Sequence, residues 1–362
     1  MTFSSRHLSP IARRRVATFN ANRRARVSLW LFIVLFVVSL AAELIANDKP
    51  IVMQFDGEWY APLLFDYPET EFGGFLPTRT DYLDPFVTRQ IEDHGWALWP
   101  PVRFSYQTLD TQMTRPSPAP PDARHWLGTD DQGRDVMARV IYGFRLSVVF
   151  ALVLTSGSLV LGVVIGGVQG YFGGKIDLIG QRVTEIWSGL PMLFLLIILA
   201  SFVQPGFWWL LGVMLLFSWL GLVDIVRAEF LRARNLEYVR AAKAMGLTSR
   251  LIMWRHVLPN AMVATLTFIP FLFTGAISTL TALDFLGFGL PPGSPSLGEL
   301  AAQGKNNLHA PWLGITAFMT LGIMLSLLVF IGEGLRDAFD PRHVNHAAIN
   351  HAEPAGKEAA HD

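Results

Sequence analysis

Six long apolar segments constrain most strongly what this chain can fold into. A transmembrane helix needs about 20 mostly apolar residues to cross a hydrocarbon core roughly 30 Å thick. Segments that meet or approach this length lie at residues 27–42, 146–168, 190–203, 207–223, 261–283 and 312–331. The third is short, and we expect it to begin earlier, in the amphipathic stretch from Ile176. The pattern predicts an all-α membrane protein with six transmembrane helices.

Composition agrees with this prediction. The chain is 51% hydrophobic and only 16% charged, whereas soluble domains carry about 25% charged residues. Basic residues precede the first apolar segment, so a signal peptide is an alternative there. The apolar run of this segment is longer than the apolar region of a signal peptide, which has about 7–15 residues, and no small-x-small cleavage site follows it. We therefore expect a retained helix over 27–46.

Charge distribution orients the predicted helices, because basic residues favour the cytoplasmic side of a membrane. Residues 1–26 hold seven Arg and no acidic residue, so we expect this segment in the cytoplasm. The cytoplasmic loop at 227–260 agrees, with seven Lys or Arg against two Glu. With six crossings, both termini, including a tail at 343–362, face the cytoplasm, and the helical core spans 124–342.

The segment 47–123 is then an outer, periplasmic insert between the first two helices. It is not a solvated linker, because thirteen aromatic residues lie between Phe55 and Tyr106. The prolines from Pro116 to Pro121 predict a stiff connector behind it. Two interpretations stay open: a small cap on the outer face, or a docking surface for an extracytoplasmic partner.

The second helix carries a stripe of small residues that predicts close helix packing. Small residues let another helix approach backbone to backbone within a membrane. The stripe consists of Ser158, Gly162, Gly166 and Gly170, and Gly174 continues the spacing.

The basic loop between the fourth and fifth helices predicts a helix–turn–helix. Asn235 is a candidate N-cap and Gly246 a candidate C-terminal cap of a helix over 236–245. Ser249 is a candidate N-cap of a second helix that ends near Pro259. The first helix places Tyr238, Ala241, Ala242 and Met245 on one shallow face, flanked by Arg240 and Lys243. Such a face suits another protein's groove, and a passive basic loop is the alternative.

This loop also resembles a known motif. Ala241-Ala242-x3-Gly246 followed by Leu258-Pro259 is similar to the EAA loop of ABC importer permeases, which docks on the ATPase subunit. Arg240 stands where that pattern has Glu, and His256 where it often has Ile. The resemblance implies that the ATPase-coupling residues are Tyr238, Arg240, Ala241, Ala242, Met245, Gly246, Leu258 and Pro259.

Two outer segments resemble the dipeptide and oligopeptide branch of these permeases, second-subunit type. The stretch from His125 to Asp135 is similar to the signature before the second helix, and Asp130 is a candidate cap of a partly apolar interfacial helix. A second stretch, Asp284 to Gly298, is similar to the segment between helices five and six, with Leu297 where many members have Trp. The signature residues are Gly128, Thr129, Asp130, Gly133, Arg134, Asp135, Gly287, Gly289, Pro291, Pro292 and Gly298.

The resemblance covers 27–46 and 124–342, and implies a type I ABC permease bundle. With the aromatic insert, the chain looks similar to permeases for microcin C and oligopeptide uptake. The implied partners are a second permease subunit, two ABC ATPase subunits, a periplasmic solute-binding protein and the lipid bilayer, and no nucleic acid. ATP and Mg would be bound by the ATPase subunits, and no cofactor by this chain.

Absent motifs narrow the function. No G-x-x-x-x-G-K-[ST] loop occurs, so no ATP site is evident, and neither His-Glu-x-x-His nor Gly-x-Ser-x-Gly is present. The tail histidines His343, His346, His351 and His361 do not predict a metal site. An ion-coupled secondary transporter would keep ionisable residues at membrane depth, where this chain has almost none. That alternative, a membrane-bound enzyme and a non-transporting assembly subunit are therefore less favoured than a permease.

Overall fold

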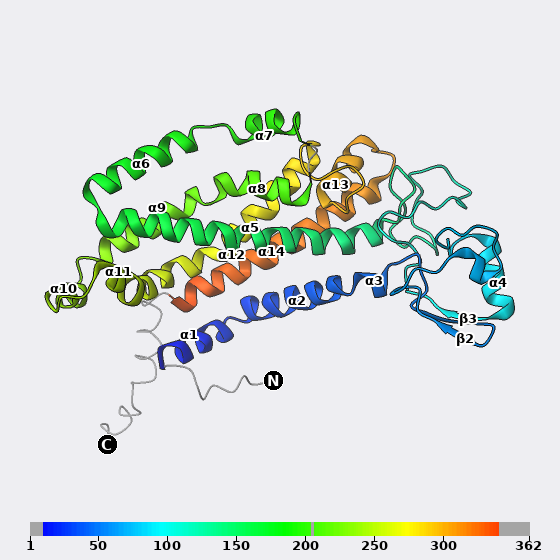
Figure 1. Cartoon of the computed structure of the whole chain (residues 1–362), viewed down its shortest axis with the longest axis horizontal. Helices are drawn as coiled ribbons and strands as arrows, with labels where there is room; N and C mark the ends of the chain where they lie inside the picture. The colour runs from blue at the N-terminus through cyan, green and yellow to red at the C-terminus, as the bar shows by residue number, and fades with distance from the viewer. Residues whose placement is uncertain (1–9, 204–205, 340–362) are drawn as a thin grey trace, which may run out of the picture.

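The computed structural model describes residues 10–203 and 206–339 as a long helical bundle with a smaller insert at one end (Figure 1). The first helices are α1 (Pro10–Ala21), α2 (Arg23–Leu40) and the single turn α3 (Ala42–Ile45). After the insert, the bundle consists of α5 (Val136–Phe172), α6 (Gly174–Ser188), α7 (Met192–Ala200), α8 (Phe207–Ser218), α9 (Leu220–Ala233), α10 (Glu237–Ala244), α11 (Ser249–Ile252), the π-turn η3 (Met253–Val257), α12 (Leu258–Phe285), α13 (Leu297–Asn306) and α14 (Pro311–Phe339).

Four helical stretches in the described part of the chain are long and apolar enough to cross a membrane. They are Val136–Phe172, Phe207–Ala233, Ser249–Phe285 and Pro311–Phe339. The pair α6 and α7 qualifies as a fifth if it is one span broken by a 63° bend. The bend falls at 189–191, where Pro191 lacks an N–H donor and disfavours helix at the preceding residue.

The first predicted span forms α2, but α2 does not pass the same test of length and composition. It has only 18 residues, and its first turn contains Arg23, Arg24 and Arg26. Its outward-facing side chains beyond that turn are nevertheless apolar, including Trp30, Val34 and Val37. The helix runs beside α14 along the lower edge of the bundle in Figure 1.

The insert contradicts the expectation of an all-α chain. It contains an antiparallel sheet of order β2-β1-β3, built from β1 (Val52–Phe55), β2 (Glu58–Tyr60) and β3 (Gly95–Leu98). The short helices η2 (Glu69–Phe72) and α4 (Pro85–His94) lie between β2 and β3. The prediction failed because the insert's strands are only three or four residues long, too short to show alternation clearly.

The aromatic residues of the insert form a core separate from that of the bundle. Phe72 is fully buried and its ring contacts those of Phe55 and Tyr60 edge-on, at centroid distances of 5.4 and 5.3 Å. Val87 and Ile91 of α4 close this core from the other side. The insert is therefore a small folded unit, as its aromatic content requires.

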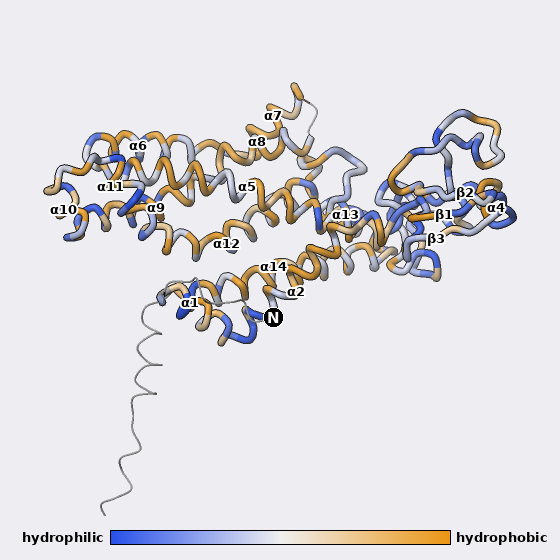
Figure 2. Tube along the Cα trace, turned by 60° about the horizontal axis from the view of Figure 1, so that its bottom comes forward, coloured by the Kyte–Doolittle hydropathy of each residue, from blue (hydrophilic) through white to orange (hydrophobic). Residues whose placement is uncertain are grey.

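The bundle core lies where α5, α8, α12 and α14 meet. Its buried residues include Phe150, Leu154, Leu210, Ile277 and Met324. Figure 2 shows hydrophobic residues along the length of these helices and hydrophilic residues concentrated at the two ends and in the insert. This distribution is that of helices surrounded by lipid over their middle portions.

Candidate functional site

The helix–turn–helix at one end of the bundle is built around the short helix α10. Val239 and Ala242 of α10 are buried and pack with Phe230, Ile252 and Val257 from the neighbouring helices. Ala242 therefore belongs to the face that holds the loop on the bundle, which corrects its expected place on the open face. Val239 could have indicated this from the sequence, because valine is more apolar than alanine and therefore marks the buried side of the helix.

The opposite face of α10 is open. Tyr238 is 38% exposed and Met245 is 73% exposed, and Ala241 lies between them on the same exposed side. Arg240 is exposed beside this face, and the Lys243 ammonium lies 5.3 Å from the centre of the Tyr171 ring. The result is a shallow surface with a methyl group at its centre and basic side chains beside it.

The turn after α10 depends on Gly246. This residue has φ +79°, a left-handed conformation that suits glycine, and its N–H donates to the Lys243 carbonyl. The N-cap of α10 is Leu236, not Asn235, whose side chain instead donates to the Leu231 carbonyl one helical turn back at 3.2 Å. Thr248 rather than Ser249 precedes α11.

The second helix of the loop does not end near Pro259, contrary to the prediction from the sequence. The chain continues without interruption from α11 through η3 and α12 to Phe285. Pro259 lies in the first turn of α12 beside Leu258, directly after the π-turn of η3. A π-turn widens the helix locally, so the proline ring and its missing N–H are accommodated. The short helix α11 is therefore continuous with α12, a helix long and apolar enough to span a membrane.

The small-residue stripe of α5 faces α9, the helix that leads into α10. A methyl group on Gly166 would lie 2.7 Å from the Val223 carbonyl oxygen, and one on Gly170 would lie 2.5 Å from that of Arg227. A methyl group on Gly162 would meet Leu222 at 2.8 Å, and the Ser158 hydroxyl hydrogen-bonds that of Ser218. Gly174 is outside this contact, in open space at the turn into α6.

A hollow of about 390 Å³ lies midway along the bundle between α5, α8 and α12. Thr155 and Ser158 of α5 line one side, and Phe271 and Thr279 of α12 line the other. The Thr155 hydroxyl has no hydrogen-bond partner among the described residues. This mixed lining of small hydroxyls and aromatic rings is open to polar and apolar groups alike.

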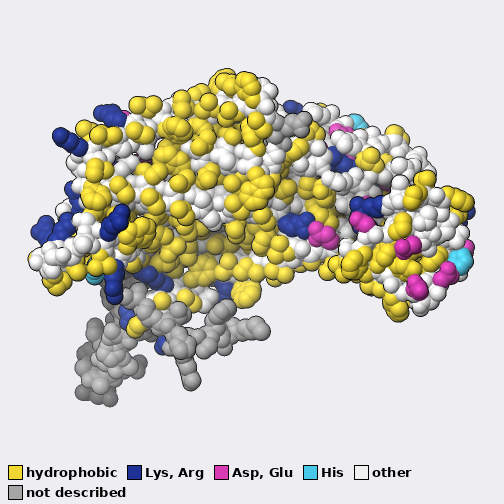
Figure 3. Space-filling view, viewed as in Figure 1, with side chains coloured by type: hydrophobic (Ala, Val, Ile, Leu, Met, Phe, Trp, Pro, Cys, Tyr) yellow, Lys and Arg dark blue, Asp and Glu magenta, His cyan; other side chains and the backbone are white. Residues whose placement is uncertain are grey.

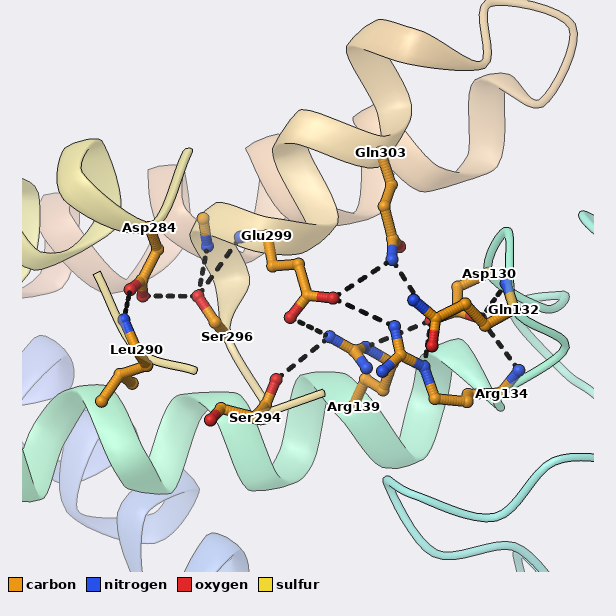
Figure 4. A network of polar contacts seen from close by, with 11 residues as sticks. Asp130, Gln132, Arg134, Arg139, Asp284, Leu290, Ser294, Ser296, Glu299 and Gln303 are labelled. Carbon is orange, nitrogen blue, oxygen red and sulfur yellow. Dashed lines mark hydrogen bonds and ion pairs between the residues drawn. The ribbon is translucent and has the colours of Figure 1, made fainter. Parts of the chain in front are cut away.

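At the opposite end of the bundle, the signature residues form a buried network of charges, shown in Figure 4. The Asp130 carboxylate accepts from the Arg134 Nε at 2.6 Å and from the backbone N–H of Gln132 and Arg134 at 2.9 Å. Asp130 thus closes a tight turn. The N-cap of α5 is Asp135, which accepts from the Ala138 N–H at 2.8 Å, and α5 begins there as one continuous helix rather than an interfacial helix followed by a span.

Glu299 of α13 joins this network across the bundle. Its Oε1 atom lies 3.1 Å from the Arg134 Nη2 atom, and its Oε2 atom lies 3.0 Å from Nη2 of Arg139. Arg139 is fully buried and also donates to the Ser294 carbonyl at 3.1 Å. One carboxylate from α13 therefore holds two arginines at the start of α5.

The second signature stretch forms the loop that supports α13. The Asp284 carboxylate accepts from the Leu290 N–H and the Ser296 hydroxyl, and it fills the space beside Gly289 that a methyl group would need. Gly298 lies against the α12 backbone. Gly287 follows the end of α12, and Pro291 and Pro292 are exposed on the loop.

Three other signature residues connect the loops at this end of the bundle. Gly128 has φ +77°, and a side chain there would meet the Ala119 carbonyl oxygen and the Trp312 ring. The Thr129 hydroxyl accepts from the Ala119 N–H at 2.9 Å, and its carbonyl accepts from the Trp312 indole N–H at 3.2 Å. Gly133 donates to the Asp130 carbonyl and accepts from the Asp110 N–H, so hydrogen bonds cross the expected insert boundary at 123.

Sequence reasoning did not identify a buried histidine in this region. His125 is 2% exposed, with Nδ1 2.8 Å from the Asp135 carboxylate and Nε2 3.1 Å from that of Asp110. Burial alone would lower the pKa of His125, but hydrogen bonds to the two carboxylates outweigh burial and raise it above its usual value. The imidazolium form, which donates from both nitrogens, links the insert to the cap of α5.

No group of three or more His, Asp or Glu side chains is arranged to hold a metal ion in residues 10–203 and 206–339. The four tail histidines lie outside the described residues. In the described residues, the arrangement consists of packing contacts, ion pairs and hydrogen bonds. Its main features are the open face of α10 at one end, the tightly packed pair of α5 and α9, and the charge network at the other end.

Comparisons with known proteins agree with this layout. Residues 158–344 match the family described as binding-protein-dependent transport system inner membrane component. The inner membrane ABC transporter permease protein YejE of Escherichia coli is 59% identical over 334 residues, which cover 92% of this chain and 98% of that protein. The peptidoglycan transport system permease protein YejE of Agrobacterium fabrum is 57% identical, covering 92% and 94%.

A more distant relative is the oligopeptide transport system permease protein OppC of Lactococcus lactis, 36% identical over 62% of this chain and 78% of that protein. These relatives are permease subunits, which have no ATPase site of their own. The match thus extends over nearly the whole length of two permeases, and a more distant match reaches an oligopeptide transport permease. The chain belongs to the inner membrane components of binding-protein-dependent transport systems, as an ABC importer permease subunit rather than an enzyme.

Proposed function

We propose that this chain forms one half of the translocation pathway of an ATP-driven importer for peptides or peptide-like compounds. The observation that carries the proposal is the match to two transport permeases over 92% of the chain. The oligopeptide permease of Lactococcus lactis supports the peptide class. The name of the Agrobacterium relative adds peptidoglycan fragments to the candidate substrates, beside oligopeptides and microcin C.

The partners in this proposal are a second permease, two ATPase subunits that bind ATP and Mg, and a periplasmic solute-binding protein. The exposed face of α10 would occupy a groove on one ATPase subunit, because its centre is only a methyl group and basic residues flank it. Closure of the ATPase pair would then move α10, and with it α9 and α12. The outer insert and the charge network would face the binding protein.

The orientation in this proposal puts α1 and α10 in the cytoplasm and the insert in the periplasm, with α2 as the sixth span. Figure 3 supports it, since Lys and Arg gather at the end with α10 while most Asp and Glu of that face lie at the insert. Basic residues on the inner side are the usual arrangement. The apolar outward side of α2 also suits contact with lipid.

Orientation is testable because the chain contains no cysteine. A single cysteine at Trp59, which is 65% exposed in the insert, should react in intact spheroplasts with a membrane-impermeant maleimide. A cysteine at Met245, in cells that express this chain without its ATPase partners, should react only after permeabilisation. Labelling of the Met245 position before permeabilisation, with the Trp59 position protected, would overturn the proposed layout.

Substrate class is testable with the complete transporter in proteoliposomes. We expect uptake of labelled oligopeptides that requires internal ATP and the binding protein, with muropeptides and microcin C as competitors. A secondary transporter would instead accumulate substrate from an imposed ion gradient, without the ATPase subunits. Such ATP-independent uptake would exclude the proposed mechanism.

A further inference from the structure

A second, larger hollow lies at the end of the bundle that carries α10, and the proposed function does not use it. It encloses about 760 Å³ between α1, the ends of α9 and α14, and the start of α12. Part of its wall is apolar, with Val263, Ala264 and Phe339 among the lining residues. Its basic lining residues are Arg14, Arg15, Arg232 and Arg336.

Positive charge in this hollow is only partly neutralised. Glu229 is the acidic lining residue, and it pairs with Arg232 at 3.7 Å. The guanidinium of Arg15 lies 4.4 Å from the centre of the Phe339 ring. Among the described residues, no carboxylate lies within ion-pair distance of Arg14, Arg15 or Arg336. Counted over the described residues, the hollow therefore has a surplus of three arginines beside an apolar wall.

The hollow also lies at the depth of a membrane surface. Arg232 and Arg336 occupy the last turns of α9 and α14, where the apolar stretches of those helices end. Carbonyl groups at helix C-termini repel anions, and these two arginines offset that effect. Basic pockets between membrane helices on the cytoplasmic side are suited to the headgroups of anionic lipids.

We propose that this hollow binds the phosphodiester headgroup of an anionic phospholipid from the cytoplasmic leaflet, with an acyl chain against the apolar wall. The leaflet follows from the orientation proposed above, whereas the choice of an amphiphile follows from the mixed lining. Tyr238 of α10 is also part of the wall, and its hydroxyl accepts from the Asn260 side chain at 3.1 Å. The bound lipid would therefore join α1 to the base of the coupling helix.

The test compares two double variants of the full chain, purified with its transporter partners. Arg14→Gln with Arg336→Gln removes two lining arginines, and Arg23→Gln with Arg24→Gln removes two exposed arginines of α2 outside the hollow. Both changes lower the net charge equally. Each complex is incorporated into nanodiscs of phosphatidylcholine with 20% phosphatidylglycerol, then extracted in detergent, and the retained lipids are counted by native mass spectrometry.

We expect the wild type and the α2 variant to retain phosphatidylglycerol in preference to phosphatidylcholine. The lining variant should retain at least five-fold less phosphatidylglycerol than the wild type. Inorganic phosphate at 10 mM should not displace the lipid. Equal retention by both double variants would overturn the proposal, because the binding would then reflect general positive charge. Displacement by inorganic phosphate would also overturn it, because the occupant would be a free anion.

Discussion

At the scale of single residues, the charge state of His125 affects the end of the bundle that carries the insert. Its raised pKa means that the folded protein favours the imidazolium, held between Asp135 and Asp110. Arg124 also faces Asp110, at 3.3 Å, and the imidazole is stacked on the Phe104 ring at 4.4 Å. A hydrogen bond to a charged group stabilises a protein by about 1.5–3 kcal/mol, so the pair is a substantial link.

The resulting stability depends on pH in a defined direction. Because the folded pKa lies above the unfolded value of about 6.5, the contribution is complete below that value and is lost as pH rises through the folded pKa. We expect the melting temperature of the purified complex to fall from pH 6 to pH 9 more in the wild type than in His125→Asn. The exposed His94→Asn is the control. Identical pH profiles for wild type and His125→Asn would contradict this role.

Glu299 gives a second prediction at this scale. Changing it to Gln removes the carboxylate shared by Arg134 and Arg139 and leaves two buried arginines facing Asp130. Breaking a buried ion pair costs about 3–5 kcal/mol, so we expect a clear loss of thermal stability.

The neighbouring Asp131→Asn supplies the control for Glu299→Gln, with the same change of charge. Asp131 is exposed, but partial desolvation and the adjacent Asp130 raise its pKa, so folding disfavours its carboxylate relative to the unfolded chain. Removing that charge should therefore be neutral or slightly stabilising. Equal melting temperatures for the two variants would contradict the importance of the network.

At the scale of elements, the contact between α5 and α9 was predictable in part. A small residue every four positions indicates a close helix contact, whichever helix is the partner. The partner itself was not predictable, because no local pattern in α9 marks it. The sheet of the insert was missed because its strands are only three or four residues long, and the link from Asp110 through His125 to Asp135 was missed because no periodicity connects these residues.

The contact between α5 and α9 predicts an asymmetric response to added methyl groups. Gly170→Ala should destabilise the protein, because its methyl group would overlap the Arg227 carbonyl and the Phe230 side chain, and overpacking costs about 1–3 kcal/mol. Gly221→Ala, in α9 with open space around it, is the matched control and should be tolerated. The check is the fraction of each variant that stays monodisperse after heating. Similar losses for both would show that the stripe is not a packing contact.

At the scale of the whole molecule, the helical bundle carries the exposed face of α10 at one end and the charge network and insert at the other (Figure 1). Hydropathy alone was enough to predict the order and positions of most spans, because burial in lipid imposes one simple requirement, but the observed helices extend beyond the predicted segments. It could not place Ala241 and Ala242 on opposite sides of α10, since alanine suits both an exposed and a buried position. Tertiary packing against Phe230 and Ile252 decides between them. If α10 docks on an ATPase subunit as proposed, the exposed Ala241 makes the contact rather than the buried Ala242.

Substrate-stimulated ATP hydrolysis by the reconstituted transporter carrying Ala241→Trp tests this account most directly. The substitution adds a large side chain to the exposed face of α10, so the bundle should assemble normally while stimulation and peptide uptake fall at least ten-fold. Ala242→Trp is the contrast: its side chain would enter the buried contact with Phe230 and Ile252, and we expect reduced protein yield. Normal stimulation and uptake with Ala241→Trp would contradict the claim that this face couples the ATPase to the membrane helices.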